Sequence, residues 1–243
     1  MSDSSVGRNI AAEFVGTTIV MLGGPGLIVL ASGSIGPLGV ALGFGISVAL
    51  AIGVIGAVAN PMFSLALWFS RGITTGEAGA DLIGQFLGAV FGGALIFGLN
   101  DTDRITRGVN GWDHSGFAEL GVVMAAEFVL ATIVVVVLLS SISQQRSNSA
   151  MAAFTGAAYA MGTLFLLDLS GSGMNPARSL GAAVFADTDP NALAQIWLFV
   201  LVPAVAAFAG TLVWLAIDDA TIDDTVFDDT VLDDLVDEIT DAD

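Results

Sequence analysis

The sequence contains no cysteine, no lysine and only one histidine, His114. Without cysteine, neither a disulfide framework nor a thiolate metal site can form. One histidine without cysteine also leaves no residues for a zinc site or for a cysteine–histidine nucleophile pair. We therefore expect no metal, no cofactor and no enzymatic activity. His114 lies in the polar connection 100–116, where we expect it to be exposed.

Charged residues are also scarce, because they make up 12% of the chain, about half their usual share in a soluble domain. Acidic residues outnumber basic ones 24 to 6, and the net charge of −18 excludes the basic face that nucleic-acid binding needs. The excess of acid and the avoidance of lysine resemble proteins of salt-accumulating halophiles, which suggests a halophilic prokaryote as the source.

Long apolar runs occupy the chain where charges are missing. A helix needs about 20 apolar residues to cross the hydrocarbon core of a bilayer. Six segments are long enough: 10–31, 36–58, 78–99, 117–142, 150–169 and 193–217. The N-terminus lacks the layout of a cleaved signal peptide, so we expect the first run to be a permanent span. The sequence thus predicts an all-α membrane protein with six transmembrane helices.

Two landmarks occur twice along the chain. Ala-Glu-Phe around Glu13 recurs around Glu127 at an offset of 114, and Asn-Pro at Asn60 recurs at Asn175 at an offset of 115. Each half contains three spans, and an odd number of spans places two copies in opposite membrane orientations. The sequence therefore predicts an inverted repeat.

An acidic tail follows the second copy of the repeat. We therefore divide the chain into a channel-like region, 1–217, and a tail, 218–243. We place the two copies at about 8–99 and 117–217. The tail contains Asp-Asp pairs at a five-residue step that suits neither helix nor strand. We expect it to be disordered and solvating, with partner binding or cation sequestration as the alternative.

Six spans place both termini on one side of the membrane. Arg8, Arg71 and Arg146 fall on that side in this topology, whereas Arg104 and Arg107 fall on the other. The excess of arginine favours cytoplasmic termini.

Both Asn-Pro dipeptides start apolar stretches that are too short to span the membrane, 60–69 and 175–185. Proline suits the first position of a helix, and asparagine is a favoured cap before it. We expect two half-helices that meet near the midplane with their positive ends toward a pore, where they disfavour cations. Asn60 and Asn175 would donate hydrogen bonds to a passing oxygen. The alternative is that each dipeptide forms an ordinary turn.

Other polar residues lie within the apolar region. Arg178 follows one turn after Asn175 and would repel cations from a pore, or else anchor a helix end. Glu13 and Glu127 could accept hydrogen bonds from the backbone of their own half-helix loops, or form a proton relay. Gln85 and Asp168 are expected to join polar networks.

At these motifs the sequence resembles the aquaporin (major intrinsic protein) family. SGSGMNPARS at 170–179 is similar to the second family signature, AEFVGT at 12–17 to its first helix, and Asn-Pro at 60–61 followed by LALW to its first signature. The resemblance covers residues 8–217. It implies six tilted helices, two re-entrant half-helices, and a homotetramer in the cell membrane with one pore per subunit.

The resemblance also implies which residues form the pore. The half-helix starts are Asn60, Pro61, Met62, Asn175, Pro176 and Ala177. The outer selectivity filter is Phe44, Thr163, Ser172 and Arg178. Glu13, Glu127 and Gln85 give structural support.

Three positions depart from the family pattern. Met62 replaces the usual alanine, and Thr163 replaces the histidine of water-selective members. Phe44 stands sixteen residues before Asn60, which shortens the connecting loop. Ser179 follows Arg178 where glycerol facilitators commonly have aspartate.

We therefore expect a passive channel for water and small neutral solutes. The nearest alternative is a glycerol or small-solute facilitator. A more distant alternative is a proton-coupled transporter that uses Glu13 and Glu127.

Overall fold

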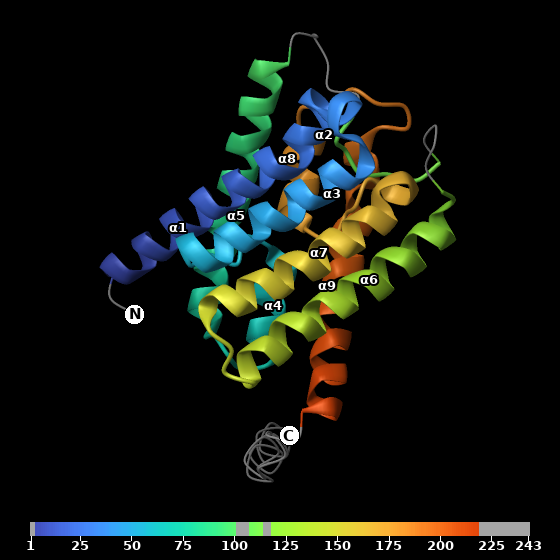
Figure 1. Cartoon of the computed structure of the whole chain (residues 1–243). Coiled ribbons are helices and arrows are strands. Elements are labelled where there is room, and N and C mark those ends of the chain that lie inside the picture. The colour runs from blue at the N-terminus through green and yellow to red at the C-terminus, as the bar shows by residue number, and fades with distance from the viewer. Residues whose placement is uncertain (1–2, 101–106, 114–117, 219–243) are drawn as a thin grey trace, which may run out of the picture.

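The computed structural model describes residues 3–100, 107–113 and 118–218 (Figure 1). Six helices in the described part are long and apolar enough to cross a membrane: Ser5–Leu30, Ser32–Ile55, Thr75–Leu99, Leu120–Ser143, Asn148–Ser170 and Ala192–Ile217. They overlap all six predicted ranges, so the prediction of six spans is confirmed. His114, Arg104 and the acidic tail after Asp218 lie outside the described residues, and the expectations for them remain untested.

In chain order the helices are α1 (Asp3–Met21), a π-helical turn (Leu22–Gly26), α2 (Leu27–Leu30), α3 (Ser32–Leu50), a second π-helical turn (Ala51–Ile55), α4 (Pro61–Phe69), α5 (Thr75–Leu99), α6 (Leu120–Ser143), α7 (Asn148–Ser170), α8 (Pro176–Ala183) and α9 (Ala192–Ile217). The second span ends before its predicted limit of 58. Gly56 has a φ of 76°, and this left-handed conformation stops the helix.

The two short helices α4 and α8 begin at the Asn-Pro dipeptides. Asn60 caps α4 because its Oδ1 accepts a hydrogen bond from the Met62 N–H at 2.9 Å. Asn175 caps α8 in the same way, accepting from the Arg178 N–H at 3.0 Å. Each dipeptide therefore starts a capped helix, and the alternative of an ordinary turn is wrong.

The packing of the helices follows the inverted repeat. Within the halves, α1 packs against α5 and α6 packs against α9, while α3 and α7 join the halves. The half-helices are exchanged, since α4 packs mainly on α9 and α8 mainly on α5. This exchange brings the starts of both half-helices into the centre of the bundle.

Glycines allow close approach of the spans, as the spacing of Gly84, Gly88 and Gly92 predicts. A Cβ added at Gly88 would lie 2.3 Å from the Phe14 carbonyl oxygen of α1. On the contact between the halves, a Cβ added at Gly45 would lie 2.4 Å from the Gly156 carbonyl oxygen. The helices touch there through their backbones.

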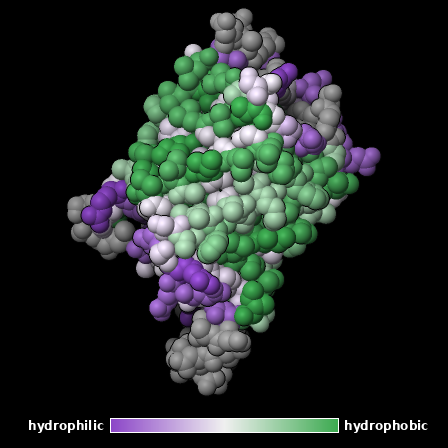
Figure 2. Space-filling model, in the orientation of Figure 1, coloured by the Kyte–Doolittle hydropathy of each residue, from purple (hydrophilic) through white to green (hydrophobic). Residues whose placement is uncertain are grey.

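The outer surface is apolar around the middle of the bundle. Figure 2 shows a broad hydrophobic band over the visible face, with hydrophilic residues gathered toward its opposite ends. Leu38, Val54 and Phe165 are among the large apolar side chains exposed on the outside. Such a surface is stable in lipid and not in water, which agrees with a membrane-spanning bundle.

Candidate pore

The starts of the two half-helices meet through their asparagines. The Asn60 Nδ2 donates to the Met174 carbonyl at 3.0 Å, and the Asn175 Nδ2 donates to the Ala59 carbonyl at 2.8 Å. Each asparagine thus binds the backbone carbonyl of the residue that directly precedes the other asparagine. A side-chain amide has two N–H groups, so each asparagine keeps a second donor beyond this contact. The positive ends of α4 and α8 face the same central region.

Two carboxylates hold the loops that lead into the half-helices. Glu13 accepts hydrogen bonds from the Val58 and Ala59 N–H groups, both at 2.8 Å, and from the Gln85 Nε2 at 2.8 Å. Glu127 accepts from the Gly173 N–H at 2.6 Å and from the Ser170 hydroxyl. The hydrogen bonds expected between each glutamate and its own loop are present.

The four candidate filter residues are all fully buried and form connected contacts. The Arg178 guanidinium carbon lies 5.3 Å from the centre of the Phe44 ring, despite the shortened loop before Asn60. Thr163 and Ser172 share a hydrogen bond of 3.0 Å between their hydroxyls. Arg178 Nη2 donates to the carbonyl of Gly171, next to Ser172, at 3.0 Å. The fold thus brings together residues from α3, α7, α8 and the loop that leads into α8.

Asn110 completes this cluster and was not among the residues that the sequence singled out. Its Oδ1 accepts hydrogen bonds from Arg178 Nη1 and, at 2.8 Å, from the Ser179 hydroxyl. Its Nδ2 donates to the Ser170 carbonyl at 3.1 Å, which fixes the side chain from the other end. A polar residue in a connecting segment gives no sequence signal of such a contact.

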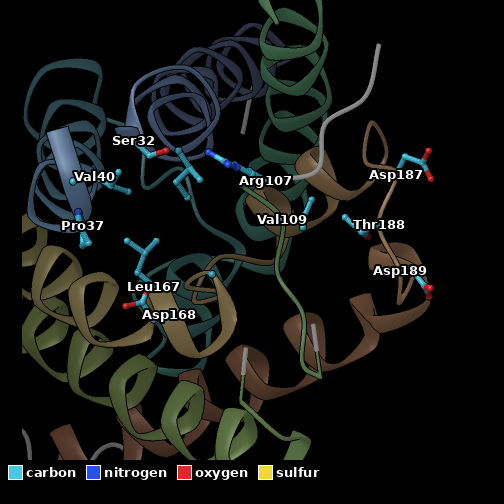
Figure 3. Close-up of a pocket in the computed structure, with 14 residues that line it drawn as sticks. Ser32, Pro37, Val40, Arg107, Val109, Leu167, Asp168, Asp187, Thr188 and Asp189 are labelled. Atoms are coloured by element: carbon cyan, nitrogen blue, oxygen red, sulfur yellow. The ribbon is translucent and has the colours of Figure 1, made fainter. Parts of the chain in front are cut away.

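A cavity of about 510 Å³ opens beside the filter cluster (Figure 3). Val40, one turn before Phe44, lines it together with Gly171 and Arg107. Asp168 is exposed at this cavity, and among the described residues it joins no polar network of the kind expected for it.

A second cavity, of about 400 Å³, is lined by Arg8, Glu13, Val58 and Asp81. The second cavity reaches the first re-entrant loop, whereas the first cavity reaches Gly171, whose carbonyl accepts from Arg178. The asparagines of the half-helix starts are buried and line neither cavity.

Comparison with known families agrees with this geometry. The family model described as major intrinsic protein matches residues 1–214 of the chain. The chain belongs to the major intrinsic protein family. Members of this family are membrane channels for water or small solutes and are not enzymes.

Relatives within the major intrinsic protein family carry two kinds of name. An aquaporin Z of Brucella melitensis is 34% identical over 227 residues, covering 85% of this chain and 96% of that protein. A glycerol uptake facilitator protein-like 6 of Lactiplantibacillus plantarum is 30% identical over 205 residues, covering 82% of this chain and 93% of that protein. Among solved structures, the aquaglyceroporin from Plasmodium falciparum has a TM-score of 0.70 at 19% identity, with 91% of this chain and 98% of that chain covered.

The residues that follow the two Asn-Pro dipeptides differ between the half-helices. Met62 in α4 and Ala177 in α8 are both fully buried, and Met62 packs within the main apolar core. Phe63, at the position that corresponds to Arg178, lies against the ring of Tyr159. The centre of this family member is therefore polar on the side of α8 and apolar on the side of α4.

Proposed function

We propose that the chain conducts water passively along a path between the two half-helix starts. The observation that carries this proposal is the pair of hydrogen bonds that cross between the half-helix starts, from Asn60 to the Met174 carbonyl and from Asn175 to the Ala59 carbonyl. Each amide keeps one N–H beyond this contact. A water molecule that passes this point would accept hydrogen bonds from both amides. The mouths of the path are the two cavities beside Arg107 and Arg8.

Exclusion of ions and protons follows from the same arrangement. The positive ends of α4 and α8 and the Arg178 guanidinium raise the energy of a cation or hydronium in the path. The Arg178 Nε has no hydrogen-bond partner among the described residues, although it is fully buried. It is suited to donate to the oxygen of a neutral molecule that passes Phe44.

Transport of glycerol or another small neutral solute is the second candidate. Thr163, in place of a histidine ring, favours it, and so does the likeness to a protein named as a glycerol uptake facilitator. Ser179 argues for water, because its hydroxyl occupies the position of the aspartate of glycerol facilitators and bonds to Asn110. We therefore propose water as the main permeant.

A proton-coupled transporter that uses Glu13 and Glu127 is less well supported. Both oxygens of Glu13 accept from backbone N–H groups, and Glu127 is bound to its own loop. A group that shuttles protons would have to give up these contacts in each cycle. Unchanged water flux in Glu13→Gln and Glu127→Gln, without dependence on a pH gradient, would exclude the transporter.

We further propose that the chain is a multi-pass protein of the cell membrane, with cytoplasmic termini and a homotetrameric assembly. Arg8 lines the cavity at the side of the termini and Arg107 lines the opposite one, which agrees with the topology inferred from arginine. The expected number of pores is one per subunit.

Stopped-flow light scattering on reconstituted protein tests the proposal. Proteoliposomes should shrink in an impermeant sugar at least about tenfold faster than empty vesicles, the effect of lowering the barrier by about 1.4 kcal/mol. In glycerol, they should re-swell slowly. Fast re-swelling in glycerol would favour the facilitator, and water flux equal to that of empty vesicles would contradict a channel.

A further inference from the structure

The chain has a single tyrosine, Tyr159, and it lies on the face of α7 that carries the candidate filter residue Thr163. Thr155, Tyr159 and Thr163 follow one another at four-residue steps, so they share this face of the helix. All three side chains are fully buried. Because Thr163 bonds to Ser172 at the filter, Tyr159 lies one turn further toward the middle of the bundle.

The Tyr159 ring connects the filter to the first half-helix. It stacks on Phe44, with ring centres 6.0 Å apart and an angle of 30° between the planes. It meets Phe63 of α4 edge to face, with ring centres 6.4 Å apart. Phe44 in turn lies against Arg178. The three rings therefore form a continuous wall that begins at the filter and ends within one turn of Asn60.

The hydroxyl of Tyr159 has no hydrogen-bond partner among the described residues, and neither has the hydroxyl of Thr155. Burial of an unpaired hydroxyl is costly, and nearly all buried polar groups are paired. A phenylalanine would fill the same space without this cost. The polar atom at Tyr159 is therefore best explained by a partner that enters the bundle from outside.

We propose that Tyr159 is a further residue that determines the selectivity of the pore, inward of the filter. Its ring limits the width of the path between Phe44 and Phe63, and its hydroxyl forms a hydrogen bond with each molecule that passes. Water fits this position, whereas a polyol with its carbon chain is too wide. This assignment rests on the proposed channel function, and it adds a second point of size selection.

Two substitutions separate the ring from the hydroxyl. Tyr159→Leu removes the ring, and we expect the ratio of glycerol to water permeability to rise at least about tenfold. Tyr159→Phe keeps the ring, and we expect an unchanged ratio with water permeability lowered about threefold, as for the loss of one hydrogen bond. Phe165→Leu is the matched control, because it removes a ring from the outer face of the same helix, where Phe165 is 63% exposed.

The measurement is stopped-flow light scattering on proteoliposomes, normalised to folded protein from size-exclusion chromatography. A ratio in Tyr159→Leu within about twofold of the parent would overturn the role of the ring. Full water permeability in Tyr159→Phe would overturn the role of the hydroxyl, and this variant decides alone if Tyr159→Leu does not fold. If the parent conducts nothing, the proposed function fails. Water flux that appears only in Tyr159→Leu would then support the ring as an obstruction of the path. If Tyr159→Leu also conducts no water, both proposals are overturned.

Discussion

The two halves of the inverted repeat hold their re-entrant loops in different ways. In the first half, a chain of hydrogen bonds runs away from the loop. Gln85 donates to Glu13 and to the Ser64 hydroxyl at 2.9 Å, and Ser64 donates to Asp81 at 2.9 Å. Asn9 closes the chain by donating to Asp81 at 2.6 Å. The loop and α4 are thereby tied to α1 and α5 of their own half.

The second half has a shorter support. Glu127 is bound by Ser170 and Gly173, and its second oxygen has no partner among the described residues. The polar group that distinguishes this half is Arg178, which is held by Gly171 and Asn110 at the filter. The first copy therefore uses its extra polar residues to anchor the loop, whereas the second copy places its charge in the candidate filter cluster.

The contact between neighbouring spans also differs between the halves, and glycine substitutions would expose this difference most strongly. A Cβ at Gly88 would meet the Phe14 carbonyl oxygen at 2.3 Å, whereas a Cβ at Gly210 would meet Val135 Cγ1 at 2.6 Å. Backbone cannot move aside as a side chain can. We expect Gly88→Ala to lower the free energy of unfolding by about 3 kcal/mol and Gly210→Ala by about 1 kcal/mol.

Titration with SDS in mixed micelles measures these free energies. Equal losses of free energy in the two variants would contradict this difference. They would mean that the backbone contact between α1 and α5 accommodates an added methyl group as well as the side-chain contact between α6 and α9 does. Gly7→Ala serves as a control, because a Cβ there meets nothing within 4 Å.

Removal of the two glutamates tests the difference between the loops themselves. Glu127 is fully buried, whereas Glu13 borders a cavity from which water can replace its carboxylate. We expect Glu127→Ala to lower the free energy of unfolding by about 2–3 kcal/mol and Glu13→Ala by about 1 kcal/mol, because unpaired buried N–H groups are costly. SDS titration measures both. A larger loss for Glu13→Ala would show that its three hydrogen bonds matter more than access to water.

Much of this architecture could be predicted from local sequence. The length of the apolar runs defines six spans, and each Asn-Pro dipeptide defines a helix start through its own backbone chemistry. The contacts of Glu13 and Glu127 with their loops followed from the repeat, which placed both acids in equivalent positions.

Other features depend on contacts between distant segments and have no local signal. Asn110 lies in a polar connection, and only the fold brings it to Arg178. Tyr159 looks like any aromatic residue of an apolar helix until its hydroxyl is found unpaired. The position of Phe44 next to Arg178 could not be derived from spacing, since the loop before Asn60 is shortened.

The smallest expected effect concerns the hydrogen bond between Asn110 and Arg178, the charged residue that distinguishes the second half. Asn110→Ala removes the acceptor for Arg178 Nη1, so the guanidinium gains freedom and the filter becomes less well defined. We expect the ratio of glycerol to water permeability to rise about threefold, the effect of one lost hydrogen bond. Ser179→Ala removes the hydroxyl that shares this acceptor but keeps the contact of Asn110 with Arg178, so it should raise the ratio less than Asn110→Ala does. Arg178→Ala removes the guanidinium itself and should raise the ratio most. If Asn110→Ala matches the parent, the Gly171 carbonyl alone positions Arg178, and the second half then needs no support from outside its own loop.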